Sequence, residues 1–203
     1  MTDSAPVIDR SFLSRDVVRV ARALIGQRLV RQWQGKRLAG RIVETEAYLG
    51  EKDAAAHTFQ GRRTDRNASM YKGGGHAYVY FTYGMHHCFN VVAGDPERPV
   101  AVLVRALEPE AGTDFMFEAR AAARSETDLC SGPAKLCEAL RIDRDLDGWD
   151  LCRGERLWIE TLRERALPSR MIGVGPRVGV DYAGEWARRP LRFWRKDNPH
   201  VSR

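Results

Sequence analysis

The chain has 203 residues and a mass of 23.0 kDa, which suits one domain or at most two small ones. Hydrophobic residues make up 43% and charged residues 30%, a globular balance that argues against collagen-like, coiled-coil and largely disordered chains. No apolar run approaches the roughly 20 residues that cross a bilayer, and the first residues lack the apolar core of a secretory signal. We expect a single domain over residues 1–203 and no membrane partner.

The net charge favours polyanionic partners. Lysine and arginine total 33 against 27 acidic residues, which gives a formal net charge of +6. A basic surplus favours binding to polyanions because binding releases condensed counterions. The surplus raises the expectation of a nucleic-acid partner without establishing one, since many basic proteins bind no nucleic acid.

The four cysteines are Cys88, Cys130, Cys137 and Cys152, and none of them forms a C-x-x-C pair. His86 and His87 are adjacent, which is not the spacing of zinc ligands. We therefore predict structural thiols and no metal site. A reducing, cytoplasmic location follows, close to the nucleoid if the partner is DNA.

The first half of the chain is predicted to form a helix, a hairpin, a long loop and a second hairpin. In chain order these elements cover Ser14–Ile25, Gln27–Trp33, Lys36–Tyr48, Gly50–Lys72, Ala77–Thr82 and His86–Val92. Ser14 is the expected N-cap of the helix, and a short helical turn is expected at Asp53–His57. Loops as long as Gly50–Lys72 are usually functional or disordered in compact domains.

The second half is predicted to contain a buried strand, two helices and two further strands. In chain order they cover Val100–Leu107, Glu110–Arg124, Ser131–Leu140, Arg156–Thr161 and Arg177–Val180. Pro133 fits the first turn of the second helix. Strands, then helices, then strands predict an α+β fold. We expect a mostly antiparallel, curved β-sheet flanked by helices, with a protruding β-hairpin.

Two acids and a tyrosine are expected on one face of the strand Lys36–Tyr48. Strict alternation groups Glu44, Glu46 and Tyr48 with Ile42. A carboxylate on a central strand is costly to bury unless a partner is available. The face is therefore either an exposed polar surface with a salt bridge or a catalytic carboxylate beside a stacking ring.

The second hairpin repeats this combination of aromatic and polar residues. Tyr78 and Tyr80 share a face, and Tyr83 falls at the turn, where it either wedges into a base stack or folds back over the hairpin. Asn90 lies within a strand and needs hydrogen-bond partners, from a purine edge or from neighbouring backbone. His57 ends an acidic segment, and a lone histidine of this kind is more often structural than functional.

The long loop is basic because it carries Arg62, Arg63, Arg66 and Lys72. The three glycines that follow Lys72 lack the order of a phosphate-binding P-loop, so no nucleotide cofactor is indicated. The loop either contacts nucleic-acid phosphates or is a solvated charged surface.

Several motifs together resemble a known family. They are Arg41-Ile-Val-Glu-Thr-Glu-Ala-Tyr-Leu-Gly50, Asp53-Ala-Ala-Ala-His57, Thr64-Asp-Arg-Asn67, Met70, Tyr78-Val-Tyr80, Tyr83-Gly-Met85, Asn90, Val104-Arg-Ala-Leu-Glu-Pro109, Leu129-Cys-Ser-Gly-Pro-Ala-Lys135 and Gly184-Glu-Trp-Ala-Arg-Arg-Pro-Leu-Arg-Phe193. In order and spacing they are similar to the alkyladenine (3-methyladenine, methylpurine) DNA glycosylases. The resemblance covers about residues 41–135 and 175–193.

The resemblance implies a role for each matching position. Glu46 would be the general base that activates water, and Arg105 would hold that water and the carboxylate. Tyr48, His57 and Tyr80 would form the pocket walls for a flipped purine. Asn90 would exclude the amino group of normal guanine, and Tyr83 would act as a wedge in the duplex.

The resemblance also implies the reaction. The expected substrate is duplex DNA with 3-methyladenine, 7-methylguanine, hypoxanthine or ethenoadenine, without ranking among them. We expect a monomeric, monofunctional enzyme that needs no cofactor and leaves an abasic site, because no amine nucleophile is indicated.

Two other functions stay open on the sequence. A metal-dependent nuclease would use Glu44, Glu46 and Asp53 as Mg²⁺ ligands, and would lose activity in EDTA. A non-catalytic nucleic-acid-binding module would use the tyrosines as stacking platforms.

Overall fold

The computed structural model of the chain describes residues 5–202. Residues 1–4 and residue 203 lie outside the described residues. The prediction that the chain does not begin with a secretory signal falls partly on residues 1–4. None of the helices within residues 5–202 combines the length and the apolar character needed to cross a membrane.

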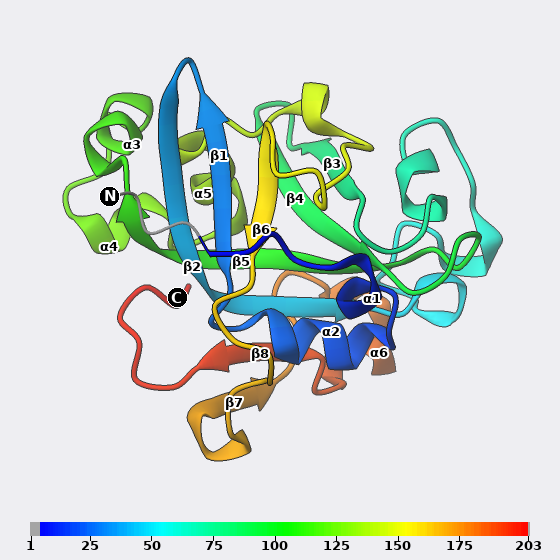
Figure 1. The fold of residues 1–203 in the computed structure, drawn as a ribbon. Helices are drawn as coiled ribbons and strands as arrows, with labels where there is room; N and C mark the ends of the chain where they lie inside the picture. Colours follow the sequence, from blue (N-terminus) through cyan, green and yellow to red (C-terminus); the bar gives the residue numbers. More distant parts are fainter. Residues whose placement is uncertain (1–4, 203) are drawn as a thin grey trace.

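The centre of the molecule is an eight-stranded antiparallel sheet (Figure 1). Its strands are β1 Arg28–Trp33, β2 Lys36–Tyr48, β3 Ala77–Thr82, β4 His86–Ala93, β5 Val100–Ala111, β6 Leu157–Glu160, β7 Ile172–Gly175 and β8 Arg192–Arg195. The strand order is β3-β4-β5-β2-β1-β6, and β8 joins β2 to β7. All seven strand pairings are antiparallel. The predicted α+β fold with a mostly antiparallel sheet is confirmed.

Strand β2 bends along its length and so joins two parts of the sheet. Figure 1 shows it first upright beside β1 and then running below β5. Its register against β5 shifts next to Gly40 and again on both sides of Glu44. A Cβ atom at Gly40 would meet the Leu107 Cβ at 3.0 Å, so a larger residue there would push the neighbouring strand away, and glycine suits this close approach. The bend leaves one edge of β2 to pair with β1 and then with β8.

Short helices lie around the sheet, and the first one corrects a prediction. The helices are α1 Arg10–Leu13, α2 Val17–Leu24, α3 Thr113–Ala119, α4 Glu126–Leu129, α5 Pro133–Ala139 and α6 Glu185–Arg188. Ser14 is not the N-cap of α2 but the residue that ends α1. Asp16 caps α2, because its carboxylate accepts hydrogen bonds from the backbone amides of Val18 and Arg19.

The helix expected over Glu110–Arg124 is much shorter in the structure. Strand β5 continues to Ala111, because the Glu110 carboxylate is held by Arg41 on the adjacent strand β2 and by Arg28 on β1 beyond it. Gly112 has a φ of +75° and ends the strand, and α3 then begins at Thr113.

Of two further expectations about local structure, one is wrong and one is confirmed as a turn. Residues 177–180 form no strand, because their polar groups bond elsewhere: the Arg177 side chain to Asp53 and the Val178 amide to Glu46. Residues 53–57 form a hydrogen-bonded turn at the expected place, without a continued helix: the Ala56 amide donates to the Asp53 carbonyl, and the Asp53 carboxylate accepts the Ala55 amide.

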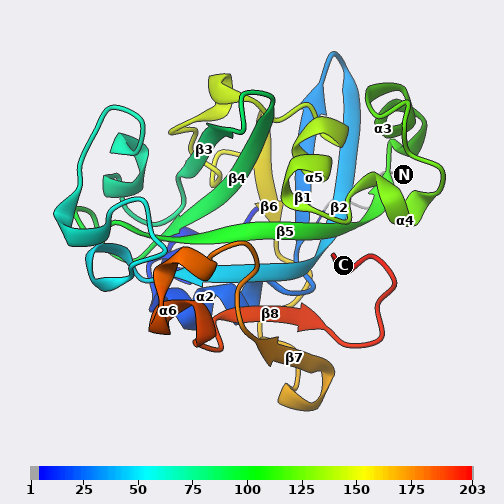
Figure 2. The ribbon, with the colours of Figure 1, turned by 180° about the vertical axis from the view of Figure 1, so that it is seen from behind.

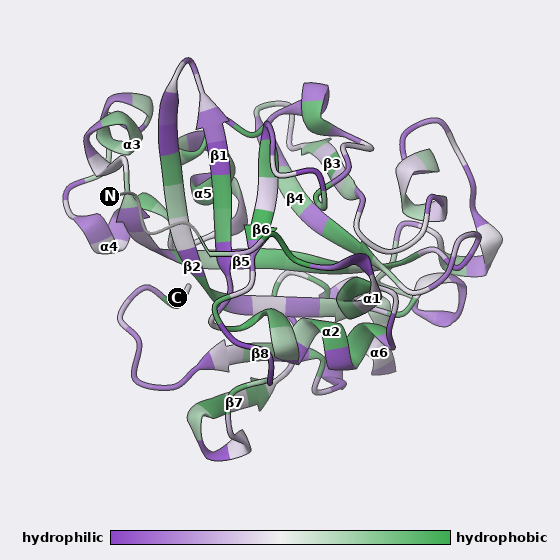
Figure 3. Ribbon diagram, viewed as in Figure 1, coloured by the Kyte–Doolittle hydropathy of each residue, from purple (hydrophilic) through white to green (hydrophobic). Residues whose placement is uncertain are grey.

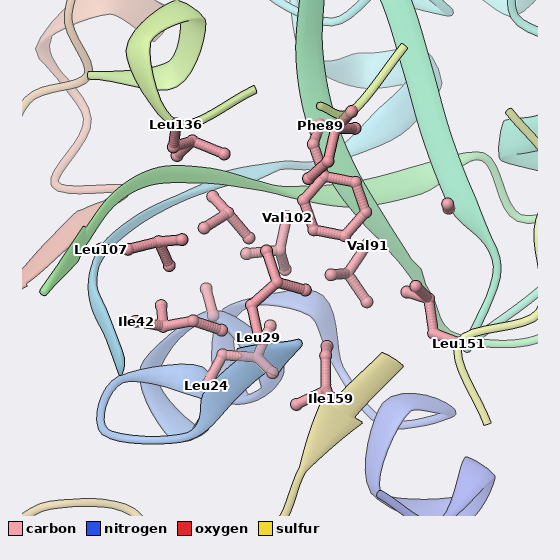
Figure 4. Close-up of a cluster of buried hydrophobic side chains, with 14 of the residues drawn as sticks. Leu24, Leu29, Ile42, Phe89, Val91, Val102, Leu107, Leu136, Leu151 and Ile159 are labelled. Carbon is pink, nitrogen blue, oxygen red and sulfur yellow. The ribbon is translucent and has the colours of Figure 1, made fainter. Parts of the chain in front are cut away.

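The main hydrophobic core lies between α2, α5 and the bent sheet. Figure 3 shows hydrophobic residues along β4, β5 and α2, with more hydrophilic residues in the surrounding loops. In Figure 4, Leu24, Ile42, Phe89 and Leu107 point toward one another from α2, β2, β4 and β5. All four cysteines are free thiols. Since Cys130 and Cys137 lie in this core, and burial raises the pKa of both thiols, the prediction of structural thiols is confirmed for them.

We expect Phe89→Ala to lower the free energy of unfolding by about 3–5 kcal/mol, because it opens a cavity at a fully buried site. Urea unfolding of the two proteins measures the difference. Phe81→Ala, on the paired strand but 42% exposed, is the matched control and should cost less than about 1 kcal/mol. Similar losses at the two positions would contradict this account of the core.

Candidate active site

A cavity of about 350 Å³ opens at one end of β5. Figure 2 shows the loop of residues 50–72, the β3–β4 hairpin and the segment before α6 gathered around this end of the sheet. The predicted site residues that line the cavity are Tyr48, His57, Tyr80, Tyr83, Asn90 and Arg105. The fold therefore brings together side chains from four strands, a hairpin turn and a loop.

Glu46 lies directly behind the cavity wall. Its side chain is fully buried and does not line the cavity itself. One carboxylate oxygen, Oε1, accepts the Val178 backbone amide at 2.8 Å and lies 3.3 Å from Nη1 of Arg105. The other, Oε2, accepts the Tyr48 hydroxyl at 2.9 Å. Val178, Arg105 and Tyr48 all line the cavity, so only these residues separate the Glu46 carboxylate from the cavity.

Glu44 is a second fully buried acid beside Glu46. Its carboxylate accepts hydrogen bonds from Arg105 at 3.2 Å, Arg192 at 2.6 Å and the Ser202 amide at 2.8 Å. Arg105 therefore lies between two carboxylates and is itself almost buried. The alternative of an exposed polar face for these acids is wrong.

The predicted grouping of Ile42 with the acids is also wrong. Ile42 lies in the main core, because the register shift beside Glu44 interrupts the strict alternation of side chains along β2. The carboxylates that a metal-dependent nuclease would use do not gather either. In residues 5–202, no three side chains of the metal-binding types come together as an ion site, and the Asp53 carboxylate is occupied by Arg177.

The environment of Glu46 makes it a stronger base than an ordinary glutamate. Burial raises the pKa of Glu46, while Arg105, the Val178 amide and the Tyr48 hydroxyl offset part of that rise. Burial and the neighbouring Glu46 also raise the pKa of Tyr48 well above its usual value. The Tyr48 hydroxyl therefore stays protonated and continues to donate its hydrogen bond.

The aromatic walls of the cavity hold one another in place. The His57 Nδ1 atom lies 2.7 Å from the Tyr78 hydroxyl, and the His57 ring meets the Tyr80 ring edge-on, with centroids 4.6 Å apart. Burial lowers the pKa of His57, and Arg66 and Arg62 lower it further. The imidazole is therefore neutral near pH 7, and the wall it forms carries no charge.

Asn90 on β4 lines the cavity and is buried. Its amide nitrogen donates to the backbone carbonyl of Tyr78 at 3.1 Å. Of the two expected kinds of hydrogen-bond partner, the neighbouring backbone is therefore present. This bond fixes the direction in which the amide faces the cavity.

Tyr83 stands out at the rim of the cavity. Its side chain is 86% exposed, so it does not fold back over the hairpin. Tyr83 and Gly84 both have positive φ angles, 52° and 69°, which is typical of a tight hairpin turn. The neighbouring Met85 is 70% exposed, and the tip of the hairpin is therefore an apolar projection beside the cavity.

The basic residues of the long loop divide into two pairs. Arg62 and Arg66 line a second hollow, of about 390 Å³, which shares His57 with the first cavity. Arg63 is ion-paired with Glu97 at 2.6 Å, and Lys72 lies 3.4 Å from the Gly148 carbonyl. The structure thus places the first pair beside the cavity, and the second pair lines neither hollow.

The sequence did not identify the segment of residues 177–182 as part of the site. Val178, Gly179, Val180 and Tyr182 line the cavity, and Arg177 lies behind Tyr48. Two signals were present: the motif similarity over residues 175–193, and an aromatic residue, Tyr182, between two nearby glycines. Because a strand was expected at residues 177–180, neither signal was used to assign this segment to the site.

Comparison with known proteins adds an independent finding. A family model described as methylpurine-DNA glycosylase (MPG) matches residues 11–199. A Methanocella arvoryzae protein, provisionally named a 3-methyladenine DNA glycosylase, is 47% identical over 198 residues, which cover 98% of this chain and 96% of that protein. The DNA-3-methyladenine glycosylase of Homo sapiens is 46% identical over 202 residues, covering 94% and 66% of the two chains.

We expect Glu46→Gln to raise the free energy of unfolding at neutral pH, because it removes a buried charge. The folded-state pKa of Glu46 is raised, so the ionised form opposes folding above that pKa and costs nothing below the ordinary glutamate pKa. The advantage of the variant should therefore grow as pH rises through this window, as measured by urea unfolding at several pH values.

Glu110→Gln is the matched control for this measurement. Burial acts to raise the pKa of Glu110, but its bonds to Arg28 and Arg41 outweigh burial and lower it. The same substitution there should lower stability at neutral pH. A Glu46→Gln protein that is less stable at neutral pH would contradict our account of the buried acid.

Proposed function

The chain belongs to the methylpurine-DNA glycosylase family, and on that premise we propose that it removes damaged purines from duplex DNA in base-excision repair. The enzyme flips the nucleotide into the cavity and hydrolyses its N-glycosidic bond, which leaves an abasic site. The observation that carries this proposal is a buried carboxylate immediately behind a cavity with aromatic walls.

A base within a duplex must leave the stack before its glycosidic bond can be attacked. A cavity of about 350 Å³ lies at the small end of the range for small-molecule sites, about 300–1,000 Å³, and suits one everted base. Tyr48 and Tyr80 supply ring faces for stacking. Purines alkylated at N3 or N7 are cationic, so they stack well on electron-rich rings, and the neutral His57 does not repel them.

Glu46 is the proposed general base. A carboxylate offers about four acceptor positions, and three are used here, by Val178 and Arg105 on one oxygen and by Tyr48 on the other. The position left on Oε2 can accept the proton of an attacking water. The same negative charge stabilises the oxocarbenium-like sugar as the bond breaks, and Arg105 keeps the carboxylate oriented.

Asn90 is proposed to discriminate against normal guanine. Its amide is fixed by the bond to the Tyr78 carbonyl and faces a cavity with little spare volume. An exocyclic amino group at that place would meet a side chain that cannot turn away. We expect 3-methyladenine, 7-methylguanine, hypoxanthine and ethenoadenine among the substrates.

Tyr83 is proposed to fill the gap that the flipped nucleotide leaves in the duplex, because an exposed apolar wedge offsets part of the unstacking cost. Arg62 and Arg66 are placed to contact the DNA backbone beside the cavity. Arg63 and Lys72 would contact more distant phosphates.

No lysine lines the cavity among the described residues. An amine nucleophile would be needed for strand cleavage, so we propose a monofunctional enzyme without lyase activity and without a cofactor. We further propose that it acts as a monomer in the cytoplasm near the nucleoid, where its four free thiols stay reduced.

Glu46→Gln should lower single-turnover release of 7-methylguanine from a duplex by at least about a hundredfold, because the general base is lost. Binding of the damaged duplex should persist. The exposed Glu118→Gln is the matched control and should keep full activity. The same reactions analysed without alkali should show no strand breaks.

Full base release by Glu46→Gln would refute the assigned base, and the lack of any base release by the parent protein would leave only a binding module. Strand breaks without alkali would refute the monofunctional assignment.

Tyr83→Ala should slow excision from duplex DNA much more than excision from single strands, because only the duplex needs its gap filled. Single-turnover rates on the two substrates measure this ratio. Tyr182→Ala, a second exposed tyrosine at the cavity, is the control. Equal slowing on both substrates would show that Tyr83 does not act as a wedge.

A further inference from the structure

We propose that the buried ion pair Asp53–Arg177 is a positioning device for Glu46, which fixes from behind two of the groups that hold its carboxylate. This inference rests on the proposed function, because it gives Glu46 a catalytic task. Neither residue touches the cavity among its described lining residues, so both would act through others.

The pair is completely buried and has two-point geometry. The Arg177 guanidinium donates from Nη1 to Asp53 Oδ2 at 2.6 Å and from Nη2 to Oδ1 at 2.8 Å, and both side chains have no exposed area. The same guanidinium donates to the carbonyl oxygens of Ala47 and Trp186. One side chain therefore joins the end of β2, the start of the long loop and the start of α6.

The first group that the pair fixes is the Tyr48 ring. The Arg177 guanidinium lies 4.6 Å from the centroid of that ring, in a cation–π contact. Tyr48 also packs in a small separate cluster with buried Ala55, Val180 and Ala183. A ring held in this way keeps its hydroxyl on Glu46 Oε2 while the cavity is empty or filled.

The second group is the backbone amide of Val178, which donates to Glu46 Oε1. Val178 follows Arg177 directly and belongs to an irregular segment without strand or helix bonds. The side chain of Arg177 is therefore a main anchor for this amide. Loss of the anchor would free both carboxylate oxygens of Glu46 from their neutral donors and leave only Arg105.

Folding stability alone gives a poor explanation for this pair. Burying two charges costs much of what their attraction returns, and well-packed apolar residues often serve stability equally well. In addition, the Arg177 Nε atom is buried without a hydrogen-bond partner, an arrangement that costs free energy. An ion pair that carries these costs one side chain away from the base is better explained by positioning.

The expected signature is a change in the pH dependence of base release. The charged or titratable groups that face Glu46 are Glu44 and Tyr48 on β2, Cys88 on β4, Arg105 on β5, Arg192 on β8 and Arg177 itself. Loss of the Tyr48 and Val178 donors removes two interactions that lower the pKa of Glu46. The acid limb of the rate profile should then move to higher pH.

The test uses Arg177→Lys and the double variant Asp53→Asn with Arg177→Met, which leaves no unpaired charge. Single-turnover release of 7-methylguanine from a duplex is measured from pH 5 to 9, together with duplex affinity. We expect the double variant to be at least tenfold slower at saturating enzyme, with its acid limb at higher pH and affinity within threefold. Arg177→Lys should also slow base release and move the acid limb to higher pH. This variant decides the test if the double variant fails to fold.

Arg37→Lys is the matched control, because Nη2 of Arg37 lies 2.9 Å from both carboxylate oxygens of buried Glu160, in an ion pair at the other end of β2. It should lose stability without a shift of the acid limb. The variants are also combined with Glu46→Gln, where the pair should have no further effect on the residual rate.

The outcomes separate the two claims. An inactive Glu46→Gln together with an unchanged rate and pH profile in the Arg177 variants would overturn the positioning role and leave the proposed function standing. A further tenfold loss in the Glu46→Gln background would likewise overturn action through Glu46. An active Glu46→Gln would overturn the assignment of Glu46 as the base, and the positioning role with it. The lack of any base release by the parent protein would overturn the proposed function itself.

Discussion

The interaction on which this structure depends is the contact of one arginine with two buried carboxylates. Glu44 and Glu46 lie on the same strand without solvent exposure, and Arg105 reaches both from the neighbouring strand. Two adjacent acids would be very costly to bury without such a partner. Arg192 and Ser202, from the end of the described chain, complete the bonds to Glu44. The C-terminal segment must therefore return to β2 before the site exists.

This constraint explains why one buried acid remains available for chemistry and the other does not. Glu44 has charged donors from two arginines, so it serves as the anchor for Arg105. Glu46 is contacted by one charged group, Arg105, and by two neutral donors, and its pKa is raised by burial. An acid with a raised pKa directly behind a cavity wall is a candidate for a catalytic site. The same strand thus supplies both the support and the proposed base.

Local patterns predicted what local rules control. Alternation and turn residues predicted the bounds of β2 and the β3–β4 hairpin. Motif similarity predicted residues that line the cavity, among them Tyr48 and Asn90. Non-local partners decided the rest. Glu110 reads as helical until Arg28 and Arg41 hold it in a strand. The segment after Arg177 has strand-like composition, but its polar groups pair with acids more than a hundred residues away. No local pattern contains such pairs.

The central claim is that an ionised Glu46 lies beside the place where positive charge develops on the sugar. The most direct measurement compares duplexes that carry a cationic pyrrolidine or a neutral tetrahydrofuran in place of the damaged nucleoside, with the parent protein and with Glu46→Gln. The parent should bind the cation at least about tenfold more tightly than the neutral ring, equivalent to about 1.4 kcal/mol, and the variant should lose this preference. An equal preference in both proteins would show that Glu46 does not act on the reacting sugar, and would contradict the account.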